Sequence, residues 1–159
     1  MFNLKRLFSI HVTVLVLSII SACEKNDSID APNQSATENA TIIALNQIDV
    51  VIGQGQLALK NSKVAVHYRG YLYDDRAENK KGKLFDTSFD LDEPLVFVLG
   101  NGQVIKGWDE GIVGMRVGGT RTLLIPAVMA YGEKRIGTAR AVIKANSALV
   151  FDVELIKVM

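Results

Sequence analysis

Apolar and polar positions alternate along several stretches in the C-terminal two thirds of the chain. Residues 63–73 put Val64, Val66 and Leu72 on one face of an extended segment, which predicts a long, half-buried strand. Residues 74–83 are charged and are expected to form an exposed loop. Shorter stretches with strand character lie at residues 48–52, 84–88, 95–99, 121–125 and 149–158.

One segment has helical spacing instead. Between residues 104 and 115 the apolar side chains form a single stripe, to which Ile105, Trp108 and Ile112 belong. Glycines at positions 107, 111 and 114 lower the helix propensity, so this helix is expected to be short and held by packing. About five antiparallel strands and one helix predict an α+β domain in which the helix covers one face of the sheet.

The first third of the chain has a different composition. Lys5 and Arg6 precede a mostly apolar run over residues 7–22, which is shorter than the roughly 20 apolar residues that span a membrane. This arrangement is typical of a secretory signal peptide, here residues 1–22. A buried N-terminal helix is the alternative, but the run is neither amphipathic nor capped.

The only cysteine, Cys23, follows Ile20-Ser21-Ala22 at the end of this run. The four residues resemble the bacterial lipobox, which implies a lipidated Cys23; the alternative is an ordinary cleavage site beside a cysteine. Residues 24–41 are polar and lack aromatic side chains, so residues 23–45 are expected to be a lipidated cysteine with a flexible tether. We therefore expect an exported protein anchored to the bacterial cell envelope. Glu24 after the cysteine resembles lipoproteins that are not retained at the inner membrane, which implies the outer membrane, facing the periplasm.

Charge and composition exclude several classes of function. A formal net charge of +1 gives no electrostatic footprint for nucleic acid. His11, His67 and Cys23 are too few for a structural zinc site, so no metal is expected. The glycine-rich stretch 100–107 has Ile105 where a dinucleotide-binding motif needs its third glycine, and Trp108 where a phosphate-binding loop needs lysine. No cofactor is therefore expected.

Five short segments, in the same order and spacing, resemble the FK506-binding-protein (FKBP) type of peptidyl-prolyl isomerase. Residues 64–72 are similar to its opening strand, and Leu84-Phe85-Asp86-Thr87-Ser88 to its Phe-Asp-Ser-Ser turn. The other similar segments are residues 99–111, residues 125–126 with 130–132, and residues 149–155. The resemblance covers residues 46–159 and implies a curled antiparallel sheet of about five strands wrapped around one short helix.

The resemblance also implies a pocket for proline-containing polypeptides and for macrolides of the FK506 type. Trp108 would form its floor, and Asp86 would help to polarise or position the site. The backbone N–H of Ile105 and the hydroxyl of Tyr131 would hydrogen-bond to substrate carbonyls. The residues expected to line the rest of the pocket are Tyr68, Phe85, Leu95, Val104, Ile143 and Phe151.

Two functions remain open at this point. The first is a lipid-anchored isomerase that accelerates rotation about Xaa-Pro bonds in exported proteins and so assists their folding, without covalent or metal catalysis. The second is a chaperone-like binding module that holds apolar or proline-containing segments without turnover. The isomerase is favoured by the residues that match the family's pocket, Tyr68, Phe85, Asp86, Ile105, Trp108 and Tyr131.

Overall fold

The computed structural model describes residues 44–90 and 93–159. The predictions for the signal peptide, for Cys23 and for most of the tether fall outside these residues. Within the described part, no helix is long and apolar enough to cross a membrane.

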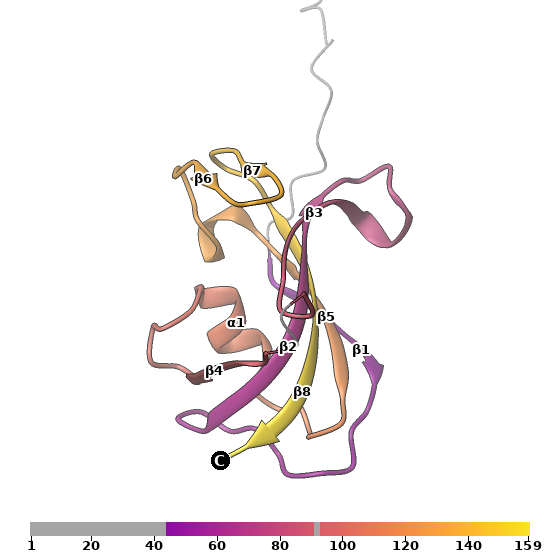
Figure 1. The fold of residues 1–159 in the computed structure, drawn as a ribbon, viewed down its shortest axis with the longest axis vertical. Helices are drawn as coiled ribbons and strands as arrows, with labels where there is room; N and C mark the ends of the chain where they lie inside the picture. The colour runs from indigo at the N-terminus through magenta and orange to yellow at the C-terminus, as the bar shows by residue number, and fades with distance from the viewer. Residues whose placement is uncertain (1–43, 91–92) are drawn as a thin grey trace, which may run out of the picture. The chain divides into compact units, whose positions relative to one another are not determined.

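The domain is built on a six-stranded antiparallel sheet (Figure 1). The long central strand β2 pairs with β8 along one edge, and β5 and β1 follow beyond β8. Along its other edge, the first half of β2 pairs with β4 and the second half with β3. The predicted α+β class is confirmed. The strands are β1 (Asn46–Val51), β2 (Lys63–Tyr73), β3 (Lys81–Thr87), β4 (Leu95–Val98), β5 (Thr120–Ile125) and β8 (Leu149–Val158).

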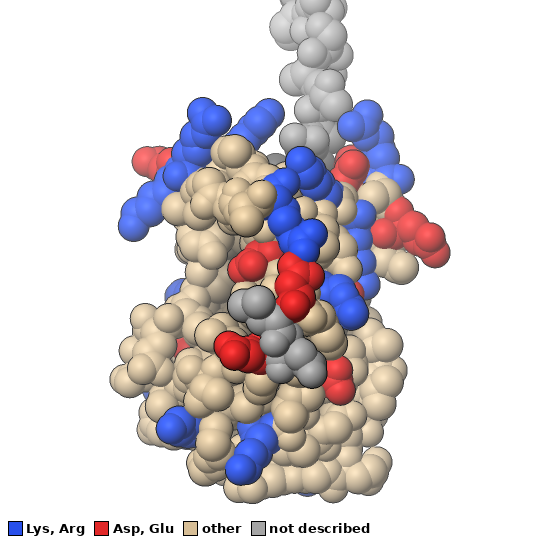
Figure 2. Space-filling view, in the orientation of Figure 1, with Lys and Arg blue, Asp and Glu red and all other residues tan. Residues whose placement is uncertain are grey.

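The connection between β2 and β3 differs from the predicted loop. A 3-10 turn, η1 (Glu78–Lys80), ends the exposed part, and β3 already begins at Lys81. The prediction of a loop over residues 74–83 was therefore wrong for its last three residues. Strand pairing between β2 and β3 extends as far as Tyr73 and Lys81, and the Lys81 ammonium also lies 2.8 Å from the Asp152 carboxylate on β8. Figure 2 shows Lys and Arg side chains mixed with Asp and Glu around this connection.

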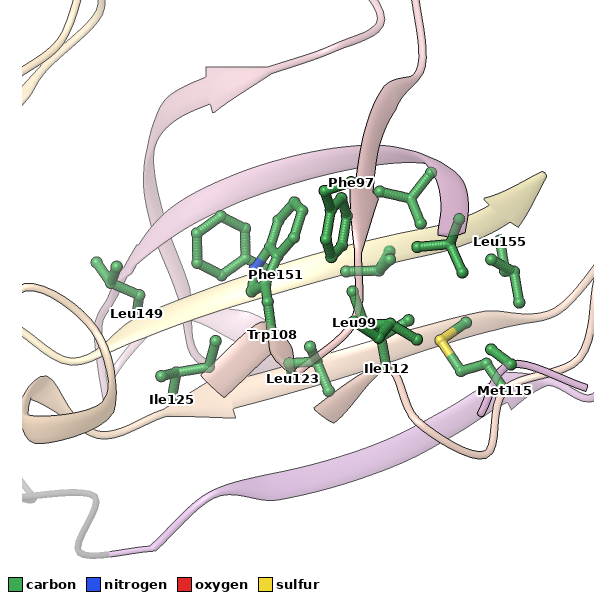
Figure 3. Close-up of a cluster of buried hydrophobic side chains, with 14 of the residues drawn as sticks. Phe97, Leu99, Trp108, Ile112, Met115, Leu123, Ile125, Leu149, Phe151 and Leu155 are labelled. Atoms are coloured by element: carbon green, nitrogen blue, oxygen red, sulfur yellow. The ribbon is translucent and has the colours of Figure 1, made fainter. Parts of the chain in front are cut away.

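The helix α1 (Lys106–Gly111) lies against one face of the sheet, and the core fills the space between them (Figures 1 and 3). Its glycines allow the close approach. A Cβ atom added to Gly107 would lie 2.4 Å from Ile125 Cγ2, and one added to Gly111 would lie 2.8 Å from Leu123 Cδ2. The residues that weaken the helix in isolation are thus the ones that let it pack against β5.

The helix is shorter than the predicted 104–115. The backbone of Ile105 is extended, with φ −61° and ψ 148°, so the helix begins at Lys106 and not at residue 104. It ends at Gly111, and Gly114 adopts a φ of +87° that reverses the chain. Ile112 and Met115 remain buried, because a turn places them on the same apolar side that a longer helix would have used.

The predicted strand at residues 48–52 is present as β1, and all six of its residues are exposed. Ile48 is 47% exposed and Val50 62%, so the apolar face of the strand points outward. Gln47 and Asp49 bind the guanidinium of Arg121, which is buried on β5. Their side chains must face that buried charge, and the neighbouring apolar residues are therefore on the opposite face.

A short hairpin that the sequence pattern did not predict follows the 3-10 turn η2 (Ala127–Met129). It consists of β6 (Ile136–Gly137) and β7 (Val142–Ile143), paired through Ile136–Ile143 and Gly137–Val142. Strands of two residues are too short to produce a recognisable alternation.

Candidate active site

A cavity of about 380 Å³ opens beside the start of α1. Nine of the ten predicted pocket residues line it; the tenth, Ile143, does not. Ile143 is 1% exposed on β7 and belongs to the hydrophobic core instead. Gln103 is an additional lining residue that the sequence did not indicate. The full lining is Tyr68, Phe85, Asp86, Leu95, Gln103, Val104, Ile105, Trp108, Tyr131 and Phe151.

Aromatic rings form the deep part of this cavity. The ring centroid of Trp108 lies 5.0 Å from that of Tyr68 and 5.2 Å from that of Phe151, both edge-to-face. Phe85 in turn meets Phe151 edge-to-face at 5.5 Å. Such edge-to-face geometry suits the ring quadrupoles. Trp108 is 3% exposed, and its indole N–H has no hydrogen-bond partner among the described residues.

Four polar groups lie at the rim of this apolar surface: two hydroxyls, a carboxylate and a backbone N–H. The Tyr68 hydroxyl donates to Asp86 Oδ2 at 2.8 Å, while Asp86 Oδ1 accepts from the Thr87 N–H at 2.9 Å. In the described part of the chain, no hydrogen bond engages the Tyr131 hydroxyl or the Ile105 N–H. Two donors therefore remain available to a bound molecule, whereas Tyr68 is tied to the carboxylate.

The environment keeps both tyrosines protonated. Burial, and then the hydrogen bond and negative charge of Asp86, raise the pKa of Tyr68 well above its usual value. Burial and the charge of Asp86 also raise the pKa of Tyr131. Both hydroxyls are therefore hydrogen-bond donors at neutral pH, and neither is poised to exchange a proton there.

The loop that precedes Val104 and Ile105 is held by side-chain hydrogen bonds that the sequence did not reveal. The Asp109 carboxylate accepts from the N–H groups of Gly100 and Gly102, each at 2.9 Å. Gln103 Oε1 accepts from the Val98 N–H at 2.7 Å. These contacts fix the backbone that presents Ile105 to the cavity.

The opposite end of α1 is anchored by Arg121, another residue that pattern analysis missed. Its guanidinium donates to the carbonyls of Gly111 (2.8 Å) and Val113 (3.2 Å). It also donates to both carboxylate oxygens of Asp49 and to the amide oxygen of Gln47. The only sequence signal would be a charged residue in a strand whose neighbours are apolar.

A second depression, of about 450 Å³, lies on the other side of the same loop. It is lined by charged side chains, including Lys60, Lys106 and Glu110, and it has no aromatic wall. Its Asp109 carboxylate is already used by Gly100 and Gly102. The smaller aromatic cavity is therefore the better candidate for the functional site.

A curled antiparallel sheet, a short helix and an aromatic cavity with free hydrogen-bond donors agree with the peptidyl-prolyl isomerase fold and pocket that the sequence resemblance implies. Residues 54–156 match the family model described as FKBP-type peptidyl-prolyl cis-trans isomerase. The chain belongs to this family, and its domain is a peptidyl-prolyl cis-trans isomerase.

Relatives and a solved structure agree with this assignment. The chain is 46% identical to an FK506-binding protein of Neisseria meningitidis serogroup A over 110 residues, which are 69% of this chain and 92% of the relative. It is also 46% identical to FK506-binding protein 1A of Neurospora crassa over 105 residues, 65% of this chain and 79% of the relative. The crystal structure of AtFKBP13 is similar with a TM-score of 0.60 and 40% identity, covering 72% of this chain and 93% of that one.

Proposed function

We propose that the cavity floored by Trp108 is the active site, and that it accelerates rotation about Xaa-Pro bonds by desolvation and hydrogen bonding. The observation that carries this proposal is that an aromatic surface lies beside two hydrogen-bond donors without a partner among the described residues, the Ile105 N–H and the Tyr131 hydroxyl. No step in this mechanism requires a nucleophile or a proton transfer.

The physics of amide rotation suits such a cavity. Rotation breaks the conjugation of the C–N bond, against a barrier of ~18–20 kcal/mol. The planar amide is more dipolar than the twisted one, so an apolar surface disfavours the planar ground state relative to the transition state. Shortening an event of tens of seconds to tens of milliseconds needs about 10³-fold, or ~4 kcal/mol.

The rim residues would hold the substrate in a bent conformation. We assign the Ile105 N–H and the Tyr131 hydroxyl to carbonyl oxygens that flank the proline. Asp86 would act through Tyr68, whose ring it fixes against Trp108 by the 2.8 Å hydrogen bond. An apolar side chain before the proline would lie against Phe85 and Leu95.

A prolyl isomerisation assay on the full chain tests this assignment. Tyr131→Phe removes one donor and leaves the ring, so kcat/KM should fall roughly three- to tenfold, the effect of one lost hydrogen bond. Tyr71→Phe is the matched control, since Tyr71 is a half-buried tyrosine outside the cavity. Peptide binding without any acceleration by the unaltered protein would favour the binding-module alternative.

Macrolides of the FK506 type are a second ligand class for the same cavity, as the names of the relatives suggest. Trp108 is the only tryptophan of the chain, so its fluorescence reports directly on the cavity. A macrolide should change this fluorescence and compete with a proline peptide. An unchanged isomerisation rate at saturating macrolide would argue against a shared site.

We further propose that the protein is an exported lipoprotein, anchored through Cys23 and facing the periplasm from the outer membrane. The support is the apolar run over residues 7–22, the lipobox-like sequence before Cys23, and Glu24 after it. Two or three acyl chains would give stable anchoring, whereas a single chain binds reversibly. The client proteins would then be proline-containing polypeptides of the cell envelope.

Metabolic labelling tests the anchor. Cells fed labelled palmitate should yield labelled protein, and Cys23→Ala should abolish the label while Ser28→Ala, a control in the predicted tether, should retain it. Fractionation of the membranes should place the labelled protein in the outer one. An unmodified Cys23 in mature protein extracted from membranes would disprove the lipid anchor.

A further inference from the structure

The hairpin formed by β6 and β7 carries an excess of positive charge. Residues 133–144 contain four basic side chains and a single carboxylate, Glu133. Lys134, Arg135 and Lys144 are exposed, and within the described residues no ion pair or hydrogen bond engages their side chains. Figure 2 shows Lys and Arg side chains gathered at the end of the domain where Figure 1 places this hairpin.

This cationic hairpin adjoins the active site. Tyr131, which lines the cavity, accepts a hydrogen bond at its carbonyl from the Lys134 N–H at 3.1 Å. Thr138, at the turn of the hairpin, donates through its hydroxyl to the carbonyl of Phe85 at 2.8 Å, and Phe85 is a wall of the cavity. Two hydrogen bonds therefore connect the backbone of the hairpin to residues that line the cavity.

Some of the other charges near the site are paired. Arg140, in the turn of the hairpin, is paired with Asp90, whereas Asp86 on the cavity rim keeps its negative charge while it accepts hydrogen bonds from Tyr68 and Thr87. The segment 74–83 has four basic and three acidic residues, several of them in contact with one another. Lys134, Arg135 and Lys144 thus give the hairpin three cations without an ion pair among the described residues, available to a substrate that extends beyond the cavity.

We propose that the cationic hairpin makes this isomerase select proline segments that carry a carboxylate a few residues from the proline. This inference rests on the proposed active site and concerns flanking positions, not the residue directly before the proline, which meets the apolar wall. An extended peptide advances roughly 3.3 Å per residue, so Asp or Glu two to four residues away lies within reach of a long basic side chain. Rim charges act mainly on association, so the selection appears in KM and in kcat/KM rather than in kcat.

The test compares peptides that share Leu-Pro and differ only by Glu, Gln or Lys placed two to four residues from the proline, on either side. With the full chain, the best Glu peptide should have a kcat/KM about three- to tenfold above its Gln counterpart, and the Lys peptide should be the slowest. The Glu preference should vanish in about 0.5 M salt, where the Debye length is only a few ångströms. A triple variant, Lys134→Gln, Arg135→Gln and Lys144→Gln, should remove it at low salt and leave the Gln peptide unaffected.

The matched control removes three positive charges elsewhere: Lys60→Gln, Lys63→Gln and Lys157→Gln. These exposed residues do not line the cavity, and Lys63 and Lys157 lie on strands at the end of the sheet away from the hairpin. The control should retain the Glu preference. Equal rates for Glu and Gln peptides, or a preference lost equally in both triple variants, would overturn the proposal.

The design separates this proposal from the proposed function. Isomerisation of all peptides at the same rate refutes selection by the hairpin and leaves the active site intact. If no peptide is isomerised, the proposed function fails, and the same peptides are compared by the quenching of Trp108 fluorescence. If the unaltered protein then binds the Glu peptide more tightly than the Gln peptide, and the triple variant Lys134→Gln, Arg135→Gln and Lys144→Gln does not, the selection is still supported. Equal binding of the two peptides by the unaltered protein would reject it.

Discussion

Replacing Arg121 with methionine should destabilise the domain. The guanidinium makes five hydrogen bonds: two to Asp49, one to Gln47, and one each to the carbonyls of Gly111 and Val113. Methionine fills similar space but donates nothing. The two carbonyls at the end of α1 and the carboxylate of Asp49 would lose their partner together.

The magnitude follows from the burial of each group. Breaking a buried ion pair costs about 3–5 kcal/mol. The side chain of Asp49 is 46% exposed, so it can rehydrate and lowers this cost. The carbonyl of Gly111 lies in a buried contact, and an unsatisfied group there costs about 1–3 kcal/mol. We therefore expect Arg121→Met to lower the free energy of unfolding by about 3 kcal/mol.

Urea unfolding followed by Trp108 fluorescence measures this loss, since the core around the single tryptophan reports on the whole domain. Arg121→Lys keeps the charge but replaces the planar, bidentate guanidinium by a single ammonium. It should therefore lower the free energy of unfolding by roughly half as much as Arg121→Met. Asp49→Asn should cost least, because the amide oxygen can still accept. A loss below about 1 kcal/mol for Arg121→Met would refute the reasoning, because the buried guanidinium would then contribute little beyond its packing.

Three further predictions concern the site and the helix beneath it. Trp108→Leu should keep the fold, lower the free energy of unfolding by less than the ~3–5 kcal/mol of an alanine substitution and reduce kcat/KM; full activity in the folded variant would make Trp108 a core residue only. Gly107→Ala should destabilise by about 1–3 kcal/mol in a thermal melt, because its Cβ would meet Ile125, whereas Gly137→Ala, with open space around it, should change little. The raised pKa values of Tyr68 and Tyr131 predict a flat kcat/KM between about pH 6 and 9, and a bell-shaped profile would contradict this. The free energy of unfolding should fall only above about pH 10, where the tyrosines of the unfolded chain lose protons that the folded state retains, and Tyr68→Phe should reduce that fall.

Local pattern and motif order were sufficient for the frame of the domain and for most of its site. The predicted alternation appears most clearly in β8, where Phe151, Val153 and Leu155 are buried and Asp152 and Glu154 are not. In β2 it is weaker, because Ala65 is buried between Val64 and Val66. Nine cavity residues were found through short motifs whose spacing is set by the turns between β3, α1 and β5. The predictions for the signal peptide and for Cys23 rest on the sequence alone.

Only the tertiary structure decided features that depend on partners distant in the chain. Strand β1 turns its apolar side outward because Arg121, more than 70 residues later, needs Gln47 and Asp49 on the inner face. From the sequence alone, Gly107 only lowers the helix propensity. The structure shows why glycine is needed there, because β5 lies too close to leave room for a side chain. Ile143 lies in the core and not in the cavity, because β7 pairs with β6 in a hairpin. Each of these strands has only two residues, which is too short for a periodic pattern in the sequence. In each case the stabilising contact joins segments that are far apart in the chain. The pattern of neighbouring residues in the sequence therefore does not reveal it.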